Sequence, residues 1–115
     1  MKHIPEHLQA LVGQAVKRID TPALVIDLDA MDRNIERMAR FAQQQGVLWR
    51  PHAKLHKSAH IAHLLEHAGA IGHCVQKVSE AEALAAGGIT NIFISNEVIA
   101  PAKLARVAAL AKALN

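Results

Sequence analysis

One stretch decides how this 115-residue sequence is interpreted: Trp49-Arg50-Pro51-His52-Ala53-Lys54-Leu55-His56-Lys57-Ser58. Cationic and potentially cationic side chains are dense here and follow a short apolar run. If residues 47–54 are extended, the period of two puts Arg50, His52 and Lys54 on one face of a strand. The helical pattern that follows places Lys54 near the carboxyl end of that strand. In alternating β/α proteins this end is where ligands bind.

Upstream of this stretch, the sequence predicts a strand followed by a helix. Asp20-Thr21-Pro22 is a turn signal, and residues 23–26 form a continuous apolar run that is typical of a strand buried on both faces. Asp29 is expected to cap the helix that follows, and Gly46 is expected to end it. The inward face of this helix is expected to carry Ile35, Met38, Ala39 and Ala42.

Downstream, the signals for a helix, a strand and a second helix follow in turn. The helix after Ser58 stops at Gly69, and residues 71–76 predict a strand. Residues 79–82, Ser-Glu-Ala-Glu, have the S-x-x-E form of a capping box and open an Ala-rich helix that Gly87-Gly88 closes. The inward face of the helix after Ser58 is expected to carry Ile61, Leu64, Leu65 and Ala68.

A last strand and helix complete the alternation. Residues 91–95 predict a strand, and Pro101 begins a helix. Strands recur about every twenty residues, each followed by an amphipathic helix, which is typical of a parallel sheet built from βαβ units. The sequence therefore predicts the α/β class. The inward face of the last helix is expected to carry Leu104, Val107, Ala108 and Ala111.

The same segments carry a family resemblance. The run RPHAKLHKS is preceded by TPALVIDLDAMDRNIERM and followed by CVQKVSEAEALAAGG and ISNEVIAPAKL. In this order, from about Asp20 to the last residue, they resemble the N-terminal part of the D-threonine aldolase / D-serine dehydratase-like enzymes. The resemblance implies a (β/α)8 TIM-type barrel of the alanine-racemase N-terminal kind that binds pyridoxal 5'-phosphate (PLP).

The length of the chain limits how much of such a barrel it can hold. A complete barrel takes roughly 200 to 400 residues, so residues 20–115 are expected to be a truncated N-terminal part with three to four β/α units. Both counts stay open, because in this family the first strand can belong to an accessory β domain. An independent small α/β domain that shares the motifs is the alternative. The open sheet edges predict a molecule that is marginally stable, dimeric or prone to aggregate.

Residues 1–19 are expected to form a leader. They contain a weakly amphipathic stretch, and the resemblance implies that such a leader packs on the barrel or on a partner subunit. The apolar positions of this stretch are Leu8, Leu11, Val12 and Ala15.

Composition excludes several classes of function. The net charge of +3 and the pI of about 9.4 suggest a nucleic-acid partner, but the few aromatic residues are not interleaved with a cationic run, so that partner is not expected. Polar residues interrupt every apolar run that could cross a membrane or act as a signal. The single cysteine, Cys74, excludes an internal disulfide and is typical of a reducing compartment, so a cytoplasmic location is expected.

Lys54 is the residue predicted to carry the chemistry. A PLP enzyme needs one lysine amine that loses its proton and bonds to the cofactor aldehyde. The positive neighbours Arg50 and His52 and partial burial would both favour the neutral amine. Lys57 is the competitor, but the pattern places it where the helix should already have begun, and the resemblance implies the first of the two lysines. Arg50 and His52 are expected either to contact the cofactor or a substrate carboxylate, or to support the strand end.

Other candidate residues follow the later strands. Gln76 ends the third predicted strand, and the resemblance implies that it contacts the cofactor or the substrate. Asn96 and Glu97 end the fourth, where Asn96 either orients a substrate or caps a turn. Cys74 shares the face of Gln76 and is expected to be a small buried filler. No glycine pattern matches a phosphate-binding or dinucleotide-binding loop.

The histidines of the next helix do not predict a catalytic metal site. His56, His60, His63 and His67 form a helical stripe opposite the apolar face, which predicts exposure to solvent and at most adventitious nickel or zinc binding. The motif H-E-x-x-H is absent. The resemblance implies a divalent metal in full-length family members, held near their C-terminus by ligands that this chain lacks.

The resemblance implies a PLP-dependent lyase that acts on a D-3-hydroxy amino acid. An aldolase of this kind cleaves the Cα–Cβ bond of D-threonine or 3-hydroxy-D-aspartate to give glycine and an aldehyde. The resemblance of the motifs QKVSEA, around Gln76, and SNEV, around Asn96, favours the aldolase. A D-serine dehydratase-like lyase, a non-catalytic PLP-binding barrel and a plain α/β interaction module are the alternatives. The expected partner is a small amino acid, with a possible homodimer, and the 115-residue chain alone is expected to be inactive.

Overall fold

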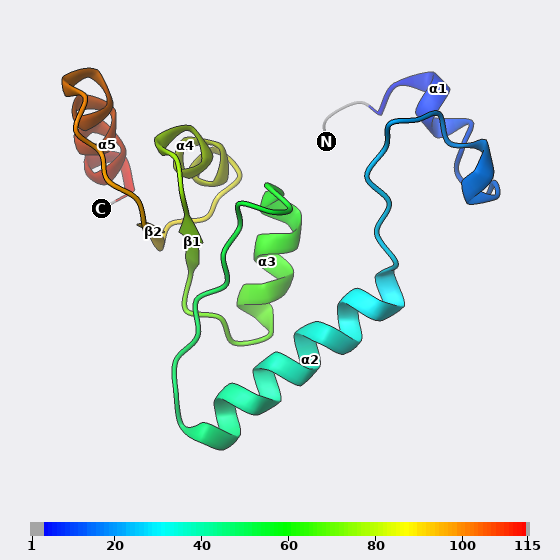
Figure 1. Cartoon of the computed structure of the whole chain (residues 1–115), viewed down its shortest axis with the longest axis horizontal. Helices are drawn as coiled ribbons and strands as arrows, with labels where there is room; N and C mark the ends of the chain where they lie inside the picture. The colour runs from blue at the N-terminus through cyan, green and yellow to red at the C-terminus, as the bar shows by residue number, and fades with distance from the viewer. Residues whose placement is uncertain (1–3, 115) are drawn as a thin grey trace.

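The computed structural model describes residues 4–114 (Figure 1). The first half of the chain holds helices, and from residue 59 onward helices and strands alternate as expected. None of the described helices combines the length and the apolar character needed to cross a membrane. In chain order the elements are α1 (Glu6–Gln9), the 3-10 helix η1 (Val16–Arg18), α2 (Leu28–Gln45), α3 (Ala59–His67), β1 (His73–Val75), α4 (Val78–Ala86), β2 (Ile92–Ile94) and α5 (Pro101–Leu114).

The two strands are parallel neighbours. In their register, His73 pairs with Ile92 and Val75 pairs with Ile94. This arrangement confirms the two later strands that the sequence predicts, although each is shorter than the predicted range. Since α4 connects them, residues 73–94 form one βαβ unit.

The predicted strand over residues 47–54 is only partly confirmed. A parallel bridge joins His52 to Cys74, the Ala53 N–H donates to the Cys74 carbonyl at 2.8 Å, and the Cys74 N–H donates to the Pro51 carbonyl at 2.8 Å. The ladder stays short because Pro51 has no N–H to donate and a turn follows at Ala53. Residues 49–53 nevertheless run along the free edge of β1, parallel to it.

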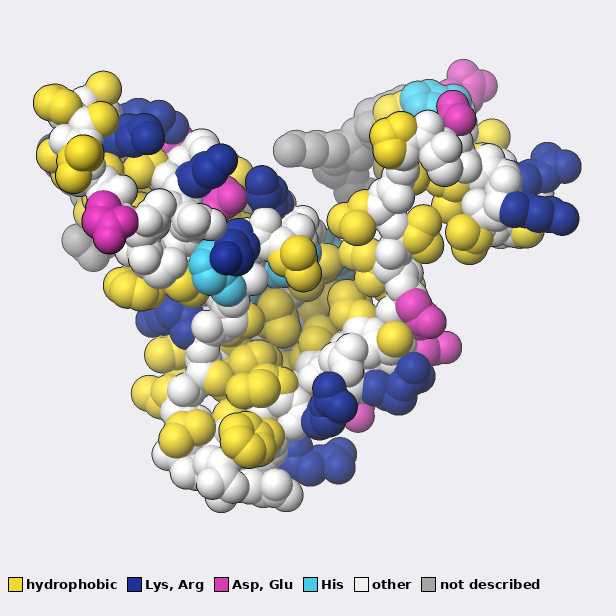
Figure 2. All heavy atoms as spheres, viewed as in Figure 1, with side chains coloured by type: hydrophobic (Ala, Val, Ile, Leu, Met, Phe, Trp, Pro, Cys, Tyr) yellow, Lys and Arg dark blue, Asp and Glu magenta, His cyan; other side chains and the backbone are white. Residues whose placement is uncertain are grey.

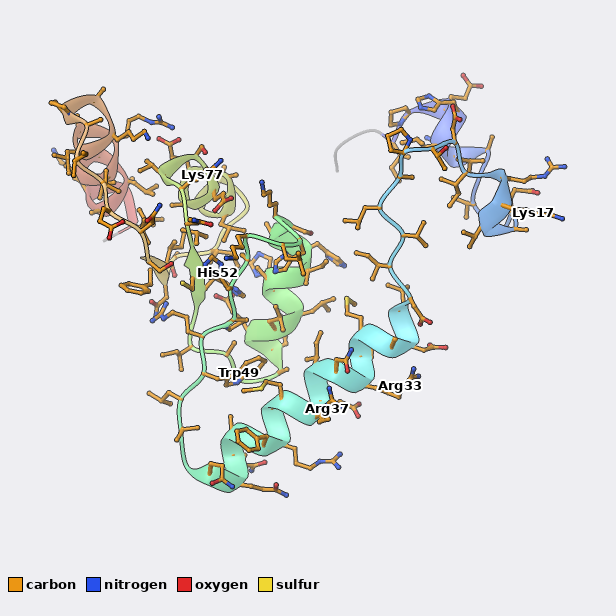
Figure 3. The ribbon with its side chains drawn as sticks, viewed as in Figure 1. Lys17, Arg33, Arg37, Trp49, His52 and Lys77 are labelled. Atoms are coloured by element: carbon orange, nitrogen blue, oxygen red, sulfur yellow. The ribbon has the colours of Figure 1, made fainter. Side chains whose placement is uncertain are left out.

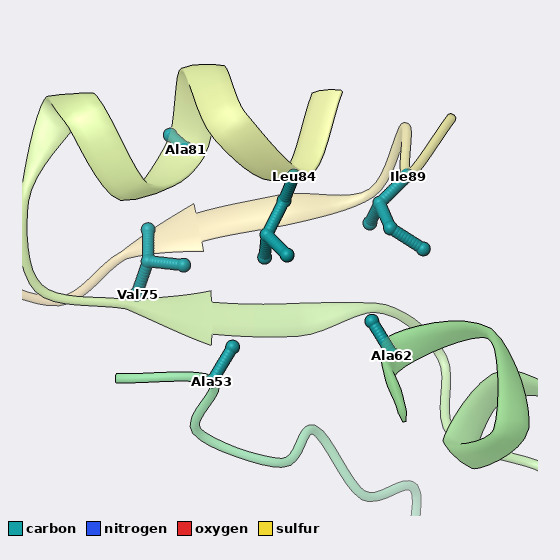
Figure 4. Close-up of a cluster of buried hydrophobic side chains, with 6 residues drawn as sticks. All are labelled: Ala53, Ala62, Val75, Ala81, Leu84 and Ile89. Carbon is teal, nitrogen blue, oxygen red and sulfur yellow. The ribbon is translucent and has the colours of Figure 1, made fainter. Parts of the chain in front are cut away.

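The core lies between this sheet and the helices α3 and α4 (Figure 4). Side chains on one face of the sheet, including Ala53 and Val75, pack against the helices, and Leu110 of α5 packs against the same cluster. The other face carries Cys74 and Phe93, and the Phe93 side chain is 56% exposed. Among the described residues this face has no helix over it. The buried cluster consists of Ala53, Ala62, Val75, Ala81, Leu84 and Ile89.

The first predicted strand is wrong. Residues 23–26 are extended but pair with no strand within residues 4–114, and Leu24 is 78% exposed. An apolar run becomes a buried strand only where a neighbouring strand takes its backbone hydrogen bonds. The predicted N-cap Asp29 is also wrong, because Asp27 is the N-cap and its Oδ1 accepts from the Ala30 N–H at 2.9 Å. Gly46 ends α2 in the left-handed conformation, as predicted.

The predicted capping box of α4 is displaced by two residues. Lys77 is the N-cap, and Glu80 Oε2 accepts the backbone N–H groups of Gln76 and Lys77, whereas the predicted box would have satisfied those of Ser79 and Glu82. The shift arises because β1 ends at Val75 and the chain stays extended only through Lys77, so the helix begins at Val78. Glu82 instead forms a two-bond ion pair with Arg106 of α5.

The inward face predicted for α5 is wrong in part. The helix begins at Pro101 as predicted, but Leu104 is 49% exposed, and Leu110 is the residue that packs on the core. The Arg106–Glu82 pair joins α5 to α4, a contact that helical periodicity alone does not specify. Ala108 and Ala111 also lie exposed.

The faces predicted for the earlier helices are closer to the structure. In α2, Ala42 is buried and Met38 is partly exposed. In α3, Leu65 is buried as predicted, but the fully buried Ala62 was not on the predicted face. In the leader, Val12 is 78% exposed, residues 1–3 lie outside the described residues, and packing against a barrel or a partner stays a prediction.

Candidate active site

The site is defined by the carboxyl edge of the parallel sheet. Lys54 follows the bridge at His52, Gln76 follows β1, and Asn96 lies two residues beyond β2. Because the three segments are parallel, their ends meet at one edge. The structure therefore brings Lys54, His52, Gln76 and Asn96 to the same edge, as the sequence predicts for a ligand site.

His52 is tied into a hydrogen-bond chain at this edge. Its Nδ1 accepts the backbone N–H of Lys54 at 3.2 Å, and its Nε2 lies 3.5 Å from the Ser95 hydroxyl. The same hydroxyl donates to the Val75 carbonyl at 3.2 Å. With Nδ1 as the acceptor, the neutral ring carries its proton on Nε2 and directs it toward Ser95. Figure 3 shows His52 beside β1, on the segment that leads to Lys54.

Ser95 is a site residue that sequence reasoning did not name. It directly follows β2, and its backbone N–H donates to the Val75 carbonyl at 2.9 Å. The period of two along β2 would have placed it on the face of Phe93, with His52 and Cys74. That signal was available in the sequence.

Lys54 is exposed and lies in the turn that leads from the sheet to α3. Within the described chain its ammonium takes part in no ion pair. Its amine is therefore accessible to a ligand from solvent. A primary amine on a short turn after a strand has the placement that covalent attachment of an aldehyde requires.

Lys57 differs from its prediction. The helix begins only at Ala59, so Lys57 lies in the loop before it, with a left-handed φ of 50°. Its Nζ lies 3.6 Å from Oε1 of Glu80, at the start of α4. The prediction that Lys57 lies inside the helix is therefore wrong. Lys57 differs from Lys54 instead by its ion pair with Glu80.

Arg50 is not brought to the carboxyl edge. Its Nη1 donates to the backbone carbonyl of Asn91 at 3.1 Å and to its side-chain Oδ1 at 2.9 Å. Asn91 precedes β2, so these bonds hold Arg50 at the amino edge of the sheet. The period of two correctly puts Arg50 on the face of His52 but does not separate the two edges. Glu97, exposed beyond β2, forms no ion pair within residues 4–114.

The histidine stripe is not uniformly solvated, which corrects the prediction. The His63 Nε2–H donates to the Gly87 carbonyl at 2.9 Å, and His56 accepts the Ser58 N–H at Nδ1, with its Nε2 buried and unpaired. Burial lowers the pKa of His56, and the nearby His73 acts in the same direction. His60 and His67 lie exposed as predicted.

His73 is the one polar residue of the described core, and sequence analysis missed it. It is fully buried in β1, and its Nε2–H donates to the Ala62 carbonyl at 3.0 Å. Burial lowers the pKa of His73, against the opposing effects of that hydrogen bond and of Glu66. Cys74 is half-buried on the opposite face rather than fully buried.

The donor set at the carboxyl edge fits PLP. Lys54 offers an accessible amine for the aldehyde, while Gln76, Ser95 and Asn96 offer neutral hydrogen-bonding groups beside it. Residues 4–114 offer no comparable set of metal ligands, because they bring no three His, Cys, Asp or Glu side chains together at one point.

Known proteins resemble the chain in sequence and in fold. The family model for the alanine racemase N-terminal domain matches residues 26–113. The 3-hydroxy-D-aspartate aldolase of Paracoccus denitrificans is 47% identical over 106 residues, which are 91% of this chain and 27% of that protein. The chain thus spans about a quarter of the length of the curated relatives it matches.

Two solved structures share the fold. The crystal structure of D-threonine aldolase from Filomicrobium marinum superposes with a TM-score of 0.79 at 53% identity, covering 82% of this chain and 26% of that one. The D-threo-3-hydroxyaspartate dehydratase from Delftia sp. HT23 superposes with a TM-score of 0.76 at 43% identity, covering 84% and 25%. Aldolases and a dehydratase therefore share this part of the fold.

Proposed function

The chain belongs to the alanine racemase N-terminal domain family, and from this we propose that it supplies the cofactor lysine of a PLP-dependent lyase acting on D-3-hydroxy amino acids. The observation that carries the proposal is the position of Lys54 at the carboxyl edge of the parallel sheet, in a chain 47% identical to a 3-hydroxy-D-aspartate aldolase. Residues 20–115 are proposed to be the N-terminal part of the PLP-binding barrel, and residues 1–19 its leader.

The residues at the edge have distinct proposed roles. Lys54 bonds to the cofactor, and His52 orients the Lys54 backbone while its Nε2–H points to Ser95. Gln76 and Asn96 are proposed to contact the cofactor or the substrate. Arg50 is proposed to support the site from the amino edge through Asn91, since its guanidinium is already engaged there. When bound, PLP supplies an electron sink for the carbanion that bond cleavage at Cα leaves.

Three β/α units are the proposed contribution to the barrel. Residues 49–53 with α3, β1 with α4, and β2 with α5 form consecutive parallel units. Residues 23–26 with α2 would be a fourth, whose extended segment has no strand beside it within residues 4–114.

Cleavage of Cα–Cβ is the favoured reaction, with dehydration as the second candidate. The Paracoccus denitrificans 3-hydroxy-D-aspartate aldolase and the Arthrobacter D-threonine aldolase match 91% and 87% of this chain at 47% and 48% identity, whereas the Delftia dehydratase matches 64% of it at 50% identity. A PLP-binding barrel without turnover would keep Lys54 and produce neither set of products.

The test is a chimera in which residues 26–113 replace the matching region of the Filomicrobium marinum enzyme. We expect glycine from D-threonine or from 3-hydroxy-D-aspartate, and loss of this product in the Lys54→Arg chimera. Formation of a 2-oxo acid and ammonia would establish the dehydratase instead. A folded chimera that binds PLP and yields no product from either substrate would support a non-catalytic barrel. The 115-residue chain alone is expected to show no turnover.

A further inference from the structure

Two lysines compete for one cofactor at the carboxyl edge. Lys54 and Lys57 lie on the same loop, between the edge segment of the sheet and α3. Their side chains are chemically identical, so an aldehyde would react with either one unless the protein distinguishes them. The structure shows a feature that does so.

That feature is Glu80, in the first turn of α4. Its Oε1 lies 3.6 Å from the Lys57 Nζ, and its Oε2 accepts the backbone N–H groups of Gln76 at 2.9 Å and Lys77 at 3.1 Å. The Gln76 bond is the largest cause that lowers the pKa of Glu80, and the Lys77 bond and Lys57 add to it. Glu80 is therefore a fixed anion whose side chain is 11% exposed, against 62% for Lys57.

The two lysines also differ in their surroundings. Lys57 and Glu80 line a cavity of about 260 Å³ together with Ala53 and Val75, whose side chains belong to the helix-covered face. Lys54 does not line this cavity and lies exposed in the turn that follows His52. The left-handed φ of Lys57 and the bond from its N–H to the Ala53 carbonyl, at 2.8 Å, fix the loop in this arrangement.

We propose that Glu80 selects the cofactor lysine by engaging the Lys57 side chain in an ion pair on the helix side and leaving the Lys54 side chain unengaged. Bond formation needs the nitrogen lone pair, which adds to the aldehyde carbon before water leaves. The ion pair holds the Lys57 Nζ at Glu80 Oε1, whereas no carboxylate of the described chain engages the Lys54 Nζ. The inference rests on the proposed function, since it presupposes that PLP reacts with this loop.

The experiment traps PLP on the purified 115-residue chain with borohydride and locates the pyridoxyl groups by peptide mass spectrometry. Glu80→Gln removes the charge but keeps an oxygen that can accept the Gln76 N–H. The control is Glu82→Gln, on the same helix, because Glu82 pairs with Arg106 and not with the loop. We expect the Lys57 share to rise about two- to fivefold in Glu80→Gln, the range for a partly exposed ion pair, and to stay unchanged in the control.

A second measurement requires no substitution. Concentrated salt screens a partly exposed ion pair, so the Lys57 share in the unaltered chain should also rise with sodium chloride. An unchanged Lys57 share in both a folded Glu80→Gln chain and in salt would overturn the selection by Glu80, yet leave Lys54 as the cofactor lysine. Labelling of Lys57 equal to that of Lys54 in the unaltered chain would also overturn it. Labelling scattered over all lysines, by contrast, would contradict the proposed function as well.

Discussion

Gly72 occupies a position where no side chain fits. It has a φ of 138°, and an added Cβ would lie 2.2 Å from the backbone carbonyl oxygen of Asn91 and 2.8 Å from Arg50 Nη1. We expect Gly72→Ala to lower the free energy of unfolding by about 2–5 kcal/mol, because backbone strain and a backbone clash add. Gly46→Ala is the matched control, since it has a positive φ but open space, and it should cost about 1 kcal/mol. Equal urea midpoints for the two variants would show that the contact with Asn91 is not tight.

The buried histidines make stability depend on pH. The pKa values of His73 and His56 are both lowered from 6.5, chiefly by burial, so the unfolded chain binds more protons than the folded one in acid. Their contribution is therefore fully present above pH 6.5 and is lost as the pH falls below it toward the lower folded values.

This dependence can be assigned to a residue. We expect the urea midpoint to fall between about pH 8 and about pH 5, and to fall less in His73→Gln, which keeps a donor for the Ala62 carbonyl but does not titrate. His60→Gln, at an exposed position of α3, should leave the dependence of the urea midpoint on pH unchanged. An identical slope in the unaltered chain and in His73→Gln would contradict the assignment to His73.

At the start of α2, Asp27 is the N-cap in the structure, whereas the sequence predicts Asp29. Asp27 Oδ1 accepts the Ala30 N–H, whereas Asp29 lies inside the first turn. We expect Asp27→Ala to cost about 1 kcal/mol, the usual value of an N-cap, and Asp29→Ala to cost less because it removes only a charge near the helix amino end. Helix content by circular dichroism and the urea midpoint would measure both. A larger loss in Asp29→Ala would favour the cap that the sequence alone predicts.

The elements that sequence predicted well are those whose neighbours are close along the chain. Strands β1 and β2 and the start of α5 at Pro101 follow from local patterns and turn residues. Failures occur where a distant partner decides the outcome. Residues 23–26 have no adjacent strand in the described chain, and α5 packs Leu110 on a core cluster built from earlier segments.

The candidate site shows the same division. The edge that holds Lys54 and Gln76 follows from strand order, which the alternation of elements predicts. The position of Arg50 depends on its bonds to Asn91, and the position of Lys57 depends on a left-handed backbone and on Glu80. No periodicity encodes these two contacts or this conformation, because the contacts join residues far apart in sequence and a positive φ is rare for lysine.

The whole molecule is open rather than closely packed. Its radius of gyration is 16.7 Å, against about 13 Å for a compact domain of this length. Figure 2 shows hydrophobic side chains gathered in the hollow between α2 and the rest of the molecule. An apolar cleft of about 500 Å³ lies there, lined among others by Ile35, Met38, Trp49 and Leu65.

This surface predicts self-association. Exposed apolar patches of this kind associate in water, so we expect the mass measured by light scattering to rise with protein concentration. Met38→Lys, in the cleft, should reduce the association, while Arg37→Gln, which does not line the cleft, should not. A monomer at all concentrations would contradict the expectation.

Titration of the chain with PLP shows whether Lys54 holds the cofactor. The visible absorption band of lysine-bound PLP should saturate at one equivalent in the unaltered chain and in Lys57→Arg, and be absent in Lys54→Arg. Arginine keeps the positive charge but cannot form the bond, so the pair of variants isolates the amine. An unchanged band in Lys54→Arg, or its loss in Lys57→Arg alone, would show that Lys54 does not hold the cofactor.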